Sequence, residues 1–161
     1  MQESSTGREA LKHLLIVYHS QSGNTRVLAE AVARGVESEP AVACRLLRAA
    51  EAETEDLLWA DAVIFGTPEN FGYMSGALKD FYDRTYEEAR EQTVALPYAL
   101  FISAGNDGSG ARYHVERILR GYAMKPVADV LIVRGESTDD DLQEAQMLGQ
   151  SLAAALALGI Y

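Results

Sequence analysis

A short polar loop carries the residues best suited to binding chemistry. It runs His19-Ser20-Gln21-Ser22-Gly23-Asn24-Thr25, between an apolar run and a segment with helical spacing. Hydroxyls, a glycine and a helix N-terminus can together hold a phosphate monoester, through backbone N–H and side-chain O–H groups and the helix dipole. The loop contains no Lys or Arg, so it predicts a phosphate site built from uncharged donors. The alternative is an ordinary turn in which Ser20 or Ser22 caps the helix.

The same loop excludes several other kinds of phosphate site. It lacks the Gly-Lys-Ser/Thr ending of a triphosphate-binding loop and the Gly-x-Gly-x-x-Gly of a dinucleotide-binding turn. A two-component receiver domain requires acidic residues after the first strand, and a low-molecular-weight tyrosine phosphatase requires a cysteine in the first loop. Neither is present here.

Two further loops follow the third and fourth apolar runs. The loop from Gly66 to Gly76 contains two aromatic residues, Phe71 and Tyr73, in a segment expected at the surface, where they could stack against a planar ring. The alternative is that Phe71 and Met74 pack into the core. The loop from Ser103 to Gly110 is rich in glycine, which permits close approach of a ligand. Taken alone, this loop is equally typical of a flexible surface segment.

Strands and helices alternate along the chain and must position these loops. The predicted strands are residues 14–18, 41–47, 62–65, 98–102 and 127–133. The predicted helices are residues 24–37, 54–59, 74–90, a segment that includes 115–122, and 139–158, the last with three aspartates in its first turn. Strict alternation predicts an α/β fold with a parallel sheet between two helical layers, in the strand order 2-1-3-4-5. The loops after strands one, three and four then meet at one edge of the sheet.

Composition sets limits on partners and location. The 161 residues include 14 Lys plus Arg against 24 Asp plus Glu, a net charge of −10 that opposes binding to nucleic acid or to anionic membranes. Residues 1–11 are predicted as a flexible tail and residues 12–161 as one domain. Cys44 is expected as a small buried residue, residues 151–161 are too short to span a bilayer, and a cytoplasmic location is the expectation.

The two sequence motifs resemble those of one group of proteins. Residues 20–25 are similar to the phosphate-binding signature of flavodoxins, Thr/Ser-x-Thr/Ser-Gly-x-Thr. Residues 60–68, with 71–76 and Leu78-Lys79, resemble the flavin-ring loop of quinone reductases of the tryptophan-repressor-binding-protein type, and of NAD(P)H-dependent FMN reductases. Those quinone reductases carry a basic residue before the phenylalanine, where this chain has Asn70. The fifth strand has no long insertion, which implies a short-chain form.

The resemblance implies a flavodoxin-like three-layer fold and one non-covalently bound FMN. The chemistry would then belong to the FMN, and no side chain is assigned as catalytic or as a metal ligand. If Glu69 and Asp107 face the ring, their charge lowers its reduction potential. The predicted cofactor-binding residues are Ser20, Gln21, Ser22, Gly23, Asn24, Thr25, Thr67, Pro68, Glu69, Asn70, Phe71, Gly72, Ser103, Ala104, Gly105, Asn106, Asp107 and Gly108.

The aromatic residues favour one activity over another. Residues 103–110 contain no aromatic residue, so one face of a bound ring would stay open to a nicotinamide or a quinone. The first hypothesis is an NAD(P)H-dependent flavin or quinone oxidoreductase. The second is a flavodoxin-type electron carrier that docks on basic redox proteins. A third is a domain that uses the fold only for protein association. The apolar residues 152–161 could pack on the body of the domain or on a second subunit, and the latter would give a homodimer.

Overall fold

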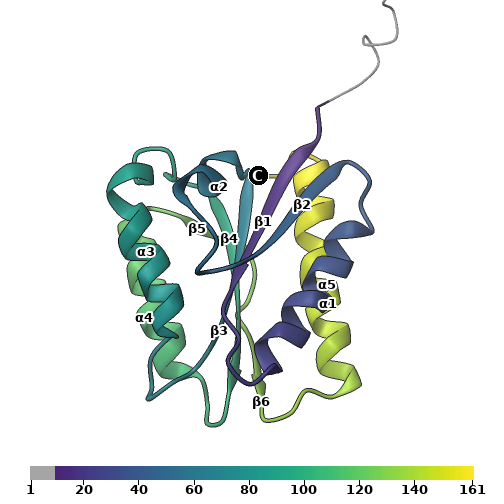
Figure 1. Cartoon of the computed structure of the whole chain (residues 1–161). Coiled ribbons are helices and arrows are strands. Elements are labelled where there is room, and N and C mark those ends of the chain that lie inside the picture. Colours follow the sequence, from purple (N-terminus) through teal and green to yellow (C-terminus); the bar gives the residue numbers. More distant parts are fainter. Residues whose placement is uncertain (1–9) are drawn as a thin grey trace, which may run out of the picture.

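The structure, a computed structural model, describes residues 10–161, so most of the predicted tail lies outside the described part. The elements are β1 (Lys12–Tyr18), α1 (Asn24–Glu37), β2 (Val42–Arg48), α2 (Thr54–Trp59), β3 (Ala62–Pro68), α3 (Gly76–Ala89), β4 (Pro97–Ala104), α4 (Ser109–Gly121), β5 (Lys125–Pro126), β6 (Leu131–Arg134) and α5 (Asp139–Ala157). Figure 1 shows three layers, with α1 and α5 on one face of the sheet and α3 and α4 on the other. In the described residues, no helix combines the length and the apolar character needed to cross a membrane.

The sheet has the predicted order, with one difference at its edge. Its strands run parallel in the order β2-β1-β3-β4-β5, and β6 also pairs with β4. The prediction of one continuous fifth strand over residues 127–133 is wrong, because β5 and β6 share that position. The N–H of Val127 still donates to the carbonyl oxygen of Tyr98 (3.0 Å). The chain then leaves the ladder at residues 128–130, where Ala128 and the exposed Asp129 are weak strand formers.

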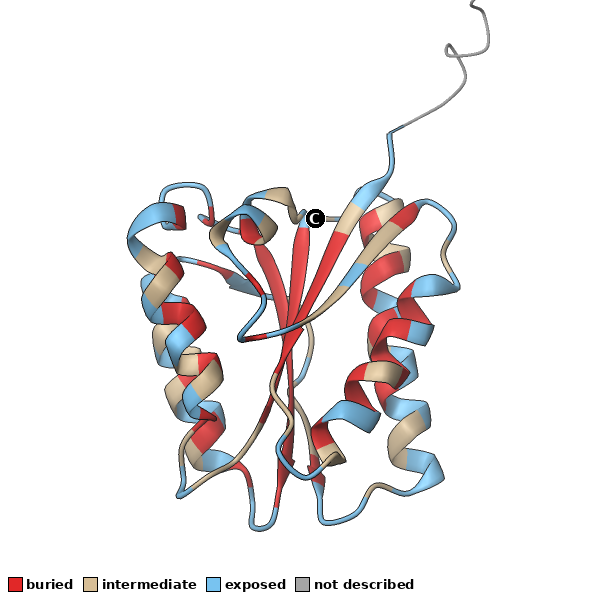
Figure 2. Cartoon of the chain, in the orientation of Figure 1, coloured by how far each residue is buried: buried red, intermediate tan, exposed pale blue. Residues whose placement is uncertain are grey.

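The apolar core lies on both faces of the sheet, as the buried residues in Figure 2 show. Strands β1, β3 and β4 read as nearly solid apolar runs because helices cover both of their faces. One cluster, which includes Phe65, Phe81 and Tyr82, lies between the sheet and the α3–α4 layer. The other includes Ile16 and Val32 and lies against α1 and α5. The sheet is therefore held rigidly from both sides.

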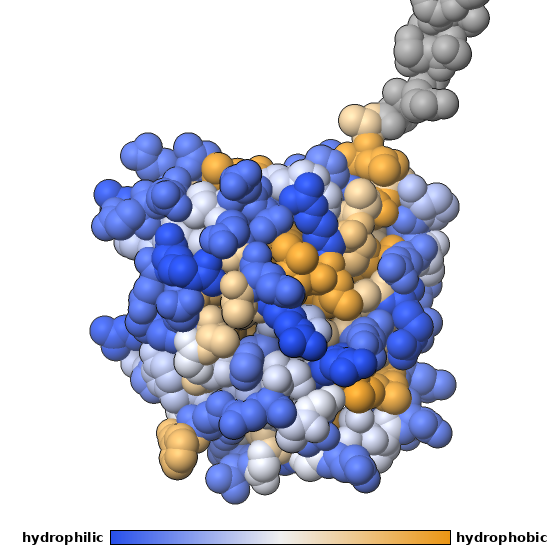
Figure 3. Space-filling model, viewed as in Figure 1, coloured by the Kyte–Doolittle hydropathy of each residue, from blue (hydrophilic) through white to orange (hydrophobic). Residues whose placement is uncertain are grey.

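Strand β2 forms the opposite edge of the sheet and is less covered than β1. Its Cys44, Leu46 and Leu47 are half-buried, and apolar atoms show in this region of the otherwise mostly hydrophilic face in Figure 3. Cys44 is thus more accessible than expected for a core residue. Burial, with a contribution from Glu37, still raises the pKa of the Cys44 thiol to about 11. The thiol is therefore protonated and unreactive near neutral pH.

Helices α1 and α5 pack closely because each has a glycine at the contact. A Cβ atom on Gly149 would lie 2.0 Å from the backbone oxygen of Val32, and one on Gly35 would lie 1.9 Å from the backbone oxygen of Gln146. Backbone atoms cannot rotate away as the end of a side chain can, so the helices would have to separate. The two glycines therefore fix the position of α1, whose first turn reaches the carboxyl edge of the sheet.

Replacement of Gly149 by alanine is expected to lower the free energy of unfolding by about 3 kcal/mol, at the upper end for overpacking. This cost exceeds the gain in helix propensity, which is roughly 1 kcal/mol. Urea unfolding, followed by the fluorescence of the single tryptophan, Trp59, measures the change. Gly121→Ala is the control, because its Cβ would meet Tyr86 at an ordinary 3.8 Å. Equal stabilities of the two variants would contradict the close helix contact.

Candidate functional site

The loops after β1, β3 and β4 meet at the carboxyl edge of the sheet, the lower edge in Figure 1. The N–H of His19 donates to the carbonyl oxygen of Gly66 (3.1 Å), and the N–H of Glu69 donates to that of Ser103 (3.0 Å). Backbone hydrogen bonds thus connect each of these segments to the next. The three loops gather where open α/β sheets bind their ligands.

The loop after β1 leads into a helix whose first N–H groups are available to a ligand. Gly23 is the N-cap of α1, with a φ of 102°, a conformation that favours glycine. The Oγ of Ser20 accepts hydrogen bonds from the N–H groups of Gly23 and Arg26 (both 3.1 Å), so Ser20 helps to cap the helix from outside it. The N–H groups of Asn24 and Thr25 donate to no other described residue. The N-terminus of α1 can therefore bind an anion through these N–H groups.

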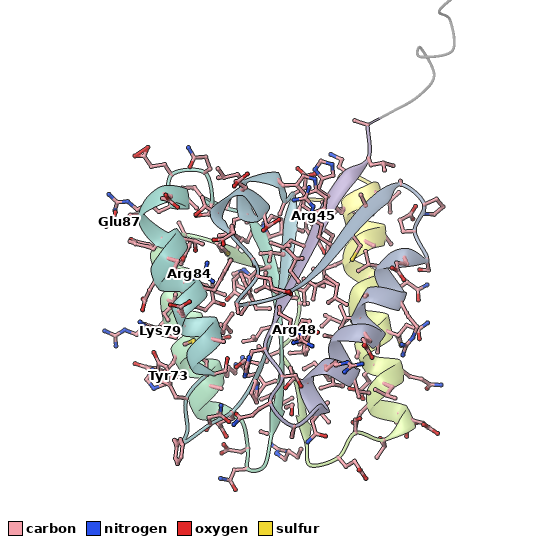
Figure 4. The ribbon with its side chains drawn as sticks, in the orientation of Figure 1. Arg45, Arg48, Tyr73, Lys79, Arg84 and Glu87 are labelled. Atoms are coloured by element: carbon pink, nitrogen blue, oxygen red, sulfur yellow. The ribbon has the colours of Figure 1, made fainter. Side chains whose placement is uncertain are left out.

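A pocket of about 300 Å³ lies at this helix end and is more positive than the loop sequence alone predicts. Its lining consists of Tyr18, Ser20, Gln21, Ser22, Gly23, Arg26 and Arg48. The Nε of Arg26 pairs with Glu30 (3.1 Å) on the next turn of α1. Arg48, labelled in Figure 4, forms no ion pair with another described residue. Its guanidinium suits a phosphate, because it offers several N–H donors and stays charged.

Arg48 was not among the predicted site residues, although the strand order contains the signal for it. Strand β2 lies beside β1, and Arg48 is in register with Tyr18, the last residue of β1. The end of the second strand therefore reaches the same edge as the end of the first. The rule that selects the loops after strands one, three and four does not include the end of strand two, where Arg48 lies.

Glu69 closes the N-terminus of α4. Its carboxylate accepts hydrogen bonds from the N–H groups of Gly108 (3.2 Å), Gly110 (3.0 Å) and Ala111 (3.1 Å). Both oxygens are engaged, so the carboxylate faces the helix end and stabilises it through charge and dipole. The expectation that Glu69 acts on the flavin ring depended on the opposite orientation and is not supported. Glu69 instead acts as a tie between the loops after β3 and β4.

Close backbone contact reinforces this tie. A Cβ on Gly110 would lie 2.0 Å from the backbone oxygen of Gly72, so only glycine fits there without movement of one of the loops. Gly108 has a φ of 75°, and a Cβ on it would lie 2.9 Å from Ile132 in β6. Gly108 and Gly110 therefore serve close packing between segments, whereas a Cβ on Gly105 would meet no atom within 4 Å.

The tip of the loop after β3 is a tight turn that displays Phe71. The N–H and carbonyl groups of Asn70 and Tyr73 bond to each other (2.8 and 2.9 Å), and both residues between them have positive φ, 52° at Phe71 and 72° at Gly72. Positive φ at both central positions defines a type I′ turn, which favours Asn or Gly. A phenylalanine there is strained. Phe71 is fully exposed, with a relative accessibility of 108%, whereas Met74 is buried.

A second pocket, of about 530 Å³, lies beside this turn. Its lining consists of Gln21, Asn70, Phe71, Tyr73, Met74 and Gly76. Gln21 also lines the phosphate-loop pocket, so the two pockets adjoin. Tyr73, Met74 and Gly76 were not among the predicted binding residues, although they belong to the loop that the sequence singled out. The arrangement places a concave surface with aromatic walls next to an anion site.

Other predicted residues of these loops hold the loops in place. The Thr67 hydroxyl accepts from the N–H of Ser75 (2.9 Å) and donates to the carbonyl of Pro68 (2.8 Å). Ser75 in turn caps α3 by accepting from the N–H of Leu78 (3.1 Å). Thr67 and Ser75 are both buried, so these bonds are shielded from water. They fix where α3 begins relative to the ring pocket.

The loop after β4 lines neither of the two pockets with its side chains. Ser103 and Ala104 end β4 and are buried, whereas Gly105 and Asn106 are exposed. Asp107 accepts hydrogen bonds from the N–H (3.0 Å) and hydroxyl (2.9 Å) of Ser109. These bonds, the backbone one first, hold the pKa of the Asp107 carboxyl below its usual value. This carboxylate therefore also serves the start of α4.

Replacement of Phe71 by asparagine is expected to stabilise the free protein by about 1 kcal/mol, because asparagine relieves the strain of positive φ at this turn. The same change removes the aromatic ring and is expected to weaken flavin binding by about 1 kcal/mol, the scale of one aromatic contact. Thermal unfolding without flavin and fluorescence titration with FMN measure the two effects. Val94→Asn, at another exposed apolar residue, is the control for surface polarity. A loss of stability in Phe71→Asn would contradict the strain.

The residues at this edge fit FMN. The N–H groups of Asn24 and Thr25 in the first turn of α1 have no acceptor among the described residues, and a Cβ placed on Gly23 would meet no atom within 4 Å. This open space lets a phosphate approach the backbone closely. Arg48 supplies positive charge there, and the adjoining pocket offers aromatic walls to a flat ring. Fold and site together define a flavodoxin-like, FMN-binding protein.

The sequence profile described as "NADPH-dependent FMN reductase" matches residues 39–139, well over half of the chain. The chain belongs to this family. The predictions of a flavodoxin-like fold, of FMN as the cofactor and of an oxidoreductase are thereby confirmed.

Individual relatives agree on the class and differ in their activity. A flavodoxin of Aquifex aeolicus is 30% identical over 90% of this chain and 87% of its own length. An NAD(P)H dehydrogenase (quinone) of Solidesulfovibrio magneticus is also 30% identical, but the match spans only 61% of each chain. The structure of a flavodoxin from the domain Archaea superposes with a TM-score of 0.80, at 29% identity, over 88% of this chain and 96% of that one.

Proposed function

We propose that this protein is an NADPH-dependent oxidoreductase that passes electrons through FMN to a quinone or to a second flavin. The supporting observation is the asymmetry of the ring site. The loop after β3 brings Phe71 and Tyr73 to the ring pocket, whereas the loop after β4 contains no aromatic residue. If the loop after β3 covers one face of the ring, the other face stays free for a nicotinamide. The nicotinamide must approach that face to about 3.5 Å for hydride transfer.

Binding and chemistry divide between the chain and its cofactor in this proposal. FMN supplies the acceptor for the hydride of reduced nicotinamide and the donor for the second substrate. The phosphate is held by the N–H groups of Asn24 and Thr25, the hydroxyl of Ser22 and the guanidinium of Arg48. Residues 70–73 orient the ring, and Glu69 fixes the loop that carries them. The remaining predicted residues in β3, β4 and their loops position these groups, chiefly through backbone hydrogen bonds.

The test is steady-state oxidation of NADPH by purified protein loaded with FMN, with a benzoquinone or free FMN as acceptor. Turnover that saturates with NADPH and requires the bound flavin supports the proposal. The Phe71→Asn variant serves as an internal check, because altered ring placement should change turnover while the protein stays folded. Absence of NADPH oxidation with every acceptor would exclude the proposal.

A flavodoxin-type electron carrier is the second candidate. It is favoured by the match to the Aquifex flavodoxin over 90% of this chain and by the net charge of −10, which would steer docking on basic redox proteins. A carrier of this kind has no small-molecule substrate of its own. It would exchange electrons rapidly with a basic cytochrome, more slowly at high salt, and would not oxidise NADPH.

A further inference from the structure

A groove between α3 and α4 is larger than either pocket at the sheet edge and shares only Tyr73 with them. It has a volume of about 750 Å³, within the range of small-molecule sites. Figure 4 shows Tyr73, Lys79 and Glu87 in succession along the α3 side. Its lining consists of Tyr73, Lys79, Tyr82, Asp83, Tyr86, Glu87, His114, Arg117, Ile118, Gly121 and Tyr122.

The groove adjoins the ring pocket through one residue. Tyr73 lines both cavities, and its ring packs against that of His114 with 4.6 Å between the centroids. Helices α3 and α4 both begin at the carboxyl edge of the sheet, so the groove runs from that edge along their length. A ligand with one end over the ring pocket can therefore extend across Tyr73 into the groove.

The groove combines aromatic walls with charges of both signs, because its lining includes Asp83 and Glu87 besides Lys79 and Arg117. Tyr86 and Tyr122 pack edge to face at 5.1 Å and form part of one wall. Lys79 lies in the first turn of α3, where its ammonium pairs with Asp83 (2.7 Å). Arg117, two turns into α4, forms no ion pair with another described residue. A flat aromatic group that carries a phosphate matches this combination, since aromatic rings stack and guanidinium groups bind phosphate.

A buried polar group adds to the case for a ligand. Tyr82 lines the groove, and its buried hydroxyl has no hydrogen-bond partner among the described residues. The neighbouring Tyr122 hydroxyl, in contrast, donates to the carbonyl of Tyr82 (2.6 Å) and contacts the Thr85 hydroxyl (2.8 Å). Buried hydroxyls without partners are uncommon in folded proteins and call for an explanation such as an additional bound molecule.

We infer that this groove binds the adenosine 2′-phosphate portion of NADPH, with the adenine against the aromatic walls and the 2′-phosphate between Lys79 and Arg117. The inference rests on the proposed function, because the nicotinamide of the same molecule must reach the open face at the ring pocket. An arginine is the usual partner of a 2′-phosphate where a protein selects NADPH over NADH. A quinone would explain the aromatic walls but would leave Arg117 without an anionic partner.

Calorimetric titration of the FMN-loaded protein with adenosine 2′,5′-bisphosphate tests the inference without turnover. We expect saturable binding of the bisphosphate, at least about tenfold tighter than binding of adenosine 5′-monophosphate. The monophosphate lacks the 2′-phosphate and so loses the charged hydrogen bond to Arg117. Arg117→Gln should weaken bisphosphate binding about tenfold. Arg120→Gln is the matched control, since Arg120 is exposed on the same helix outside the groove. Equal affinities for the two nucleotides, or no effect of Arg117→Gln, would overturn the inference.

Kinetics then separate this inference from the proposed function. Arg117→Gln should raise the KM for NADPH about tenfold and leave kcat and the KM for NADH unchanged. If the bisphosphate binds as expected but NADPH is not oxidised, the proposed function fails and the adenosine site stands. If NADPH is oxidised with the same KM by wild type and Arg117→Gln, the function stands and the groove assignment fails. A quinone that displaces the bisphosphate competitively would also overturn it.

Discussion

The Glu69→Ala variant is expected to lose about 3 kcal/mol of folding free energy and most of its affinity for FMN. The Glu69 carboxylate receives three backbone N–H groups at the start of α4. Hydrogen bonds to a charged group contribute about 1.5–3 kcal/mol each, but bonds to one carboxylate are not additive, so the total lies below the sum. The loops after β3 and β4 lose their tie, and the ring pocket loses its fixed shape.

Chemical denaturation and flavin titration measure the two losses in Glu69→Ala. Glu116→Ala is the matched control, because Glu116 lies on the same helix in an exposed pair with Arg112 (3.3 Å), which contributes roughly 0.5 kcal/mol or less. Glu69→Gln should fall between the wild type and Glu69→Ala, since it keeps one acceptor oxygen but loses the charge. Equal effects of Glu69→Ala and Glu116→Ala would show that the tie does not hold the site.

The Arg48→Gln variant is expected to bind FMN about 10- to 100-fold more weakly, while its affinity for riboflavin stays the same. Arg48 lines the pocket at the N-terminus of α1 and has no carboxylate partner in the described part of the chain. A charged hydrogen bond to a phosphate contributes about 1.5–3 kcal/mol. Riboflavin has the same ring and no phosphate, so the difference between the two flavins isolates this contact.

Quenching of flavin fluorescence gives both dissociation constants for Arg48→Gln. The control is Arg45→Gln, three residues earlier on β2, where the guanidinium pairs with Asp56 (3.0 Å) and lies 4.0 Å from the centroid of the Trp59 ring. That change should leave both flavins unaffected. A parallel loss of FMN and riboflavin affinity in Arg48→Gln would mean that Arg48 supports the fold of the site and does not contact the phosphate.

The fold could be predicted almost completely from the sequence because its signals are local. The apolar stripe of residues 24–37 and the three aspartates in the first turn of α5 are signals within one element. Both helices lie where these signals place them. The fifth strand was predicted less well. Its pairing with β4 is divided between β5 and β6, and residues 128–130 leave the ladder between them.

The candidate site could be predicted by position but not by orientation. The strand-end rule correctly brings three loops to one edge, yet it cannot say whether Glu69 points at a ring or at a helix. That choice depends on contacts between segments about forty residues apart. Arg48 was missed for a related reason, because its proximity to Ser20 comes from strand pairing and not from nearness in the sequence.

Two of the helix ends at this edge, those of α1 and α4, have a consequence for cofactor selectivity. Both α1 and α4 begin here, but α4 already holds the Glu69 carboxylate, whereas α1 holds no side-chain anion. The N-terminus of α1 is therefore receptive to a doubly charged group, whereas the N-terminus of α4 would repel one. We expect discrimination against FAD, because its added adenylate carries a second phosphate that the Glu69 carboxylate at the neighbouring helix end would repel.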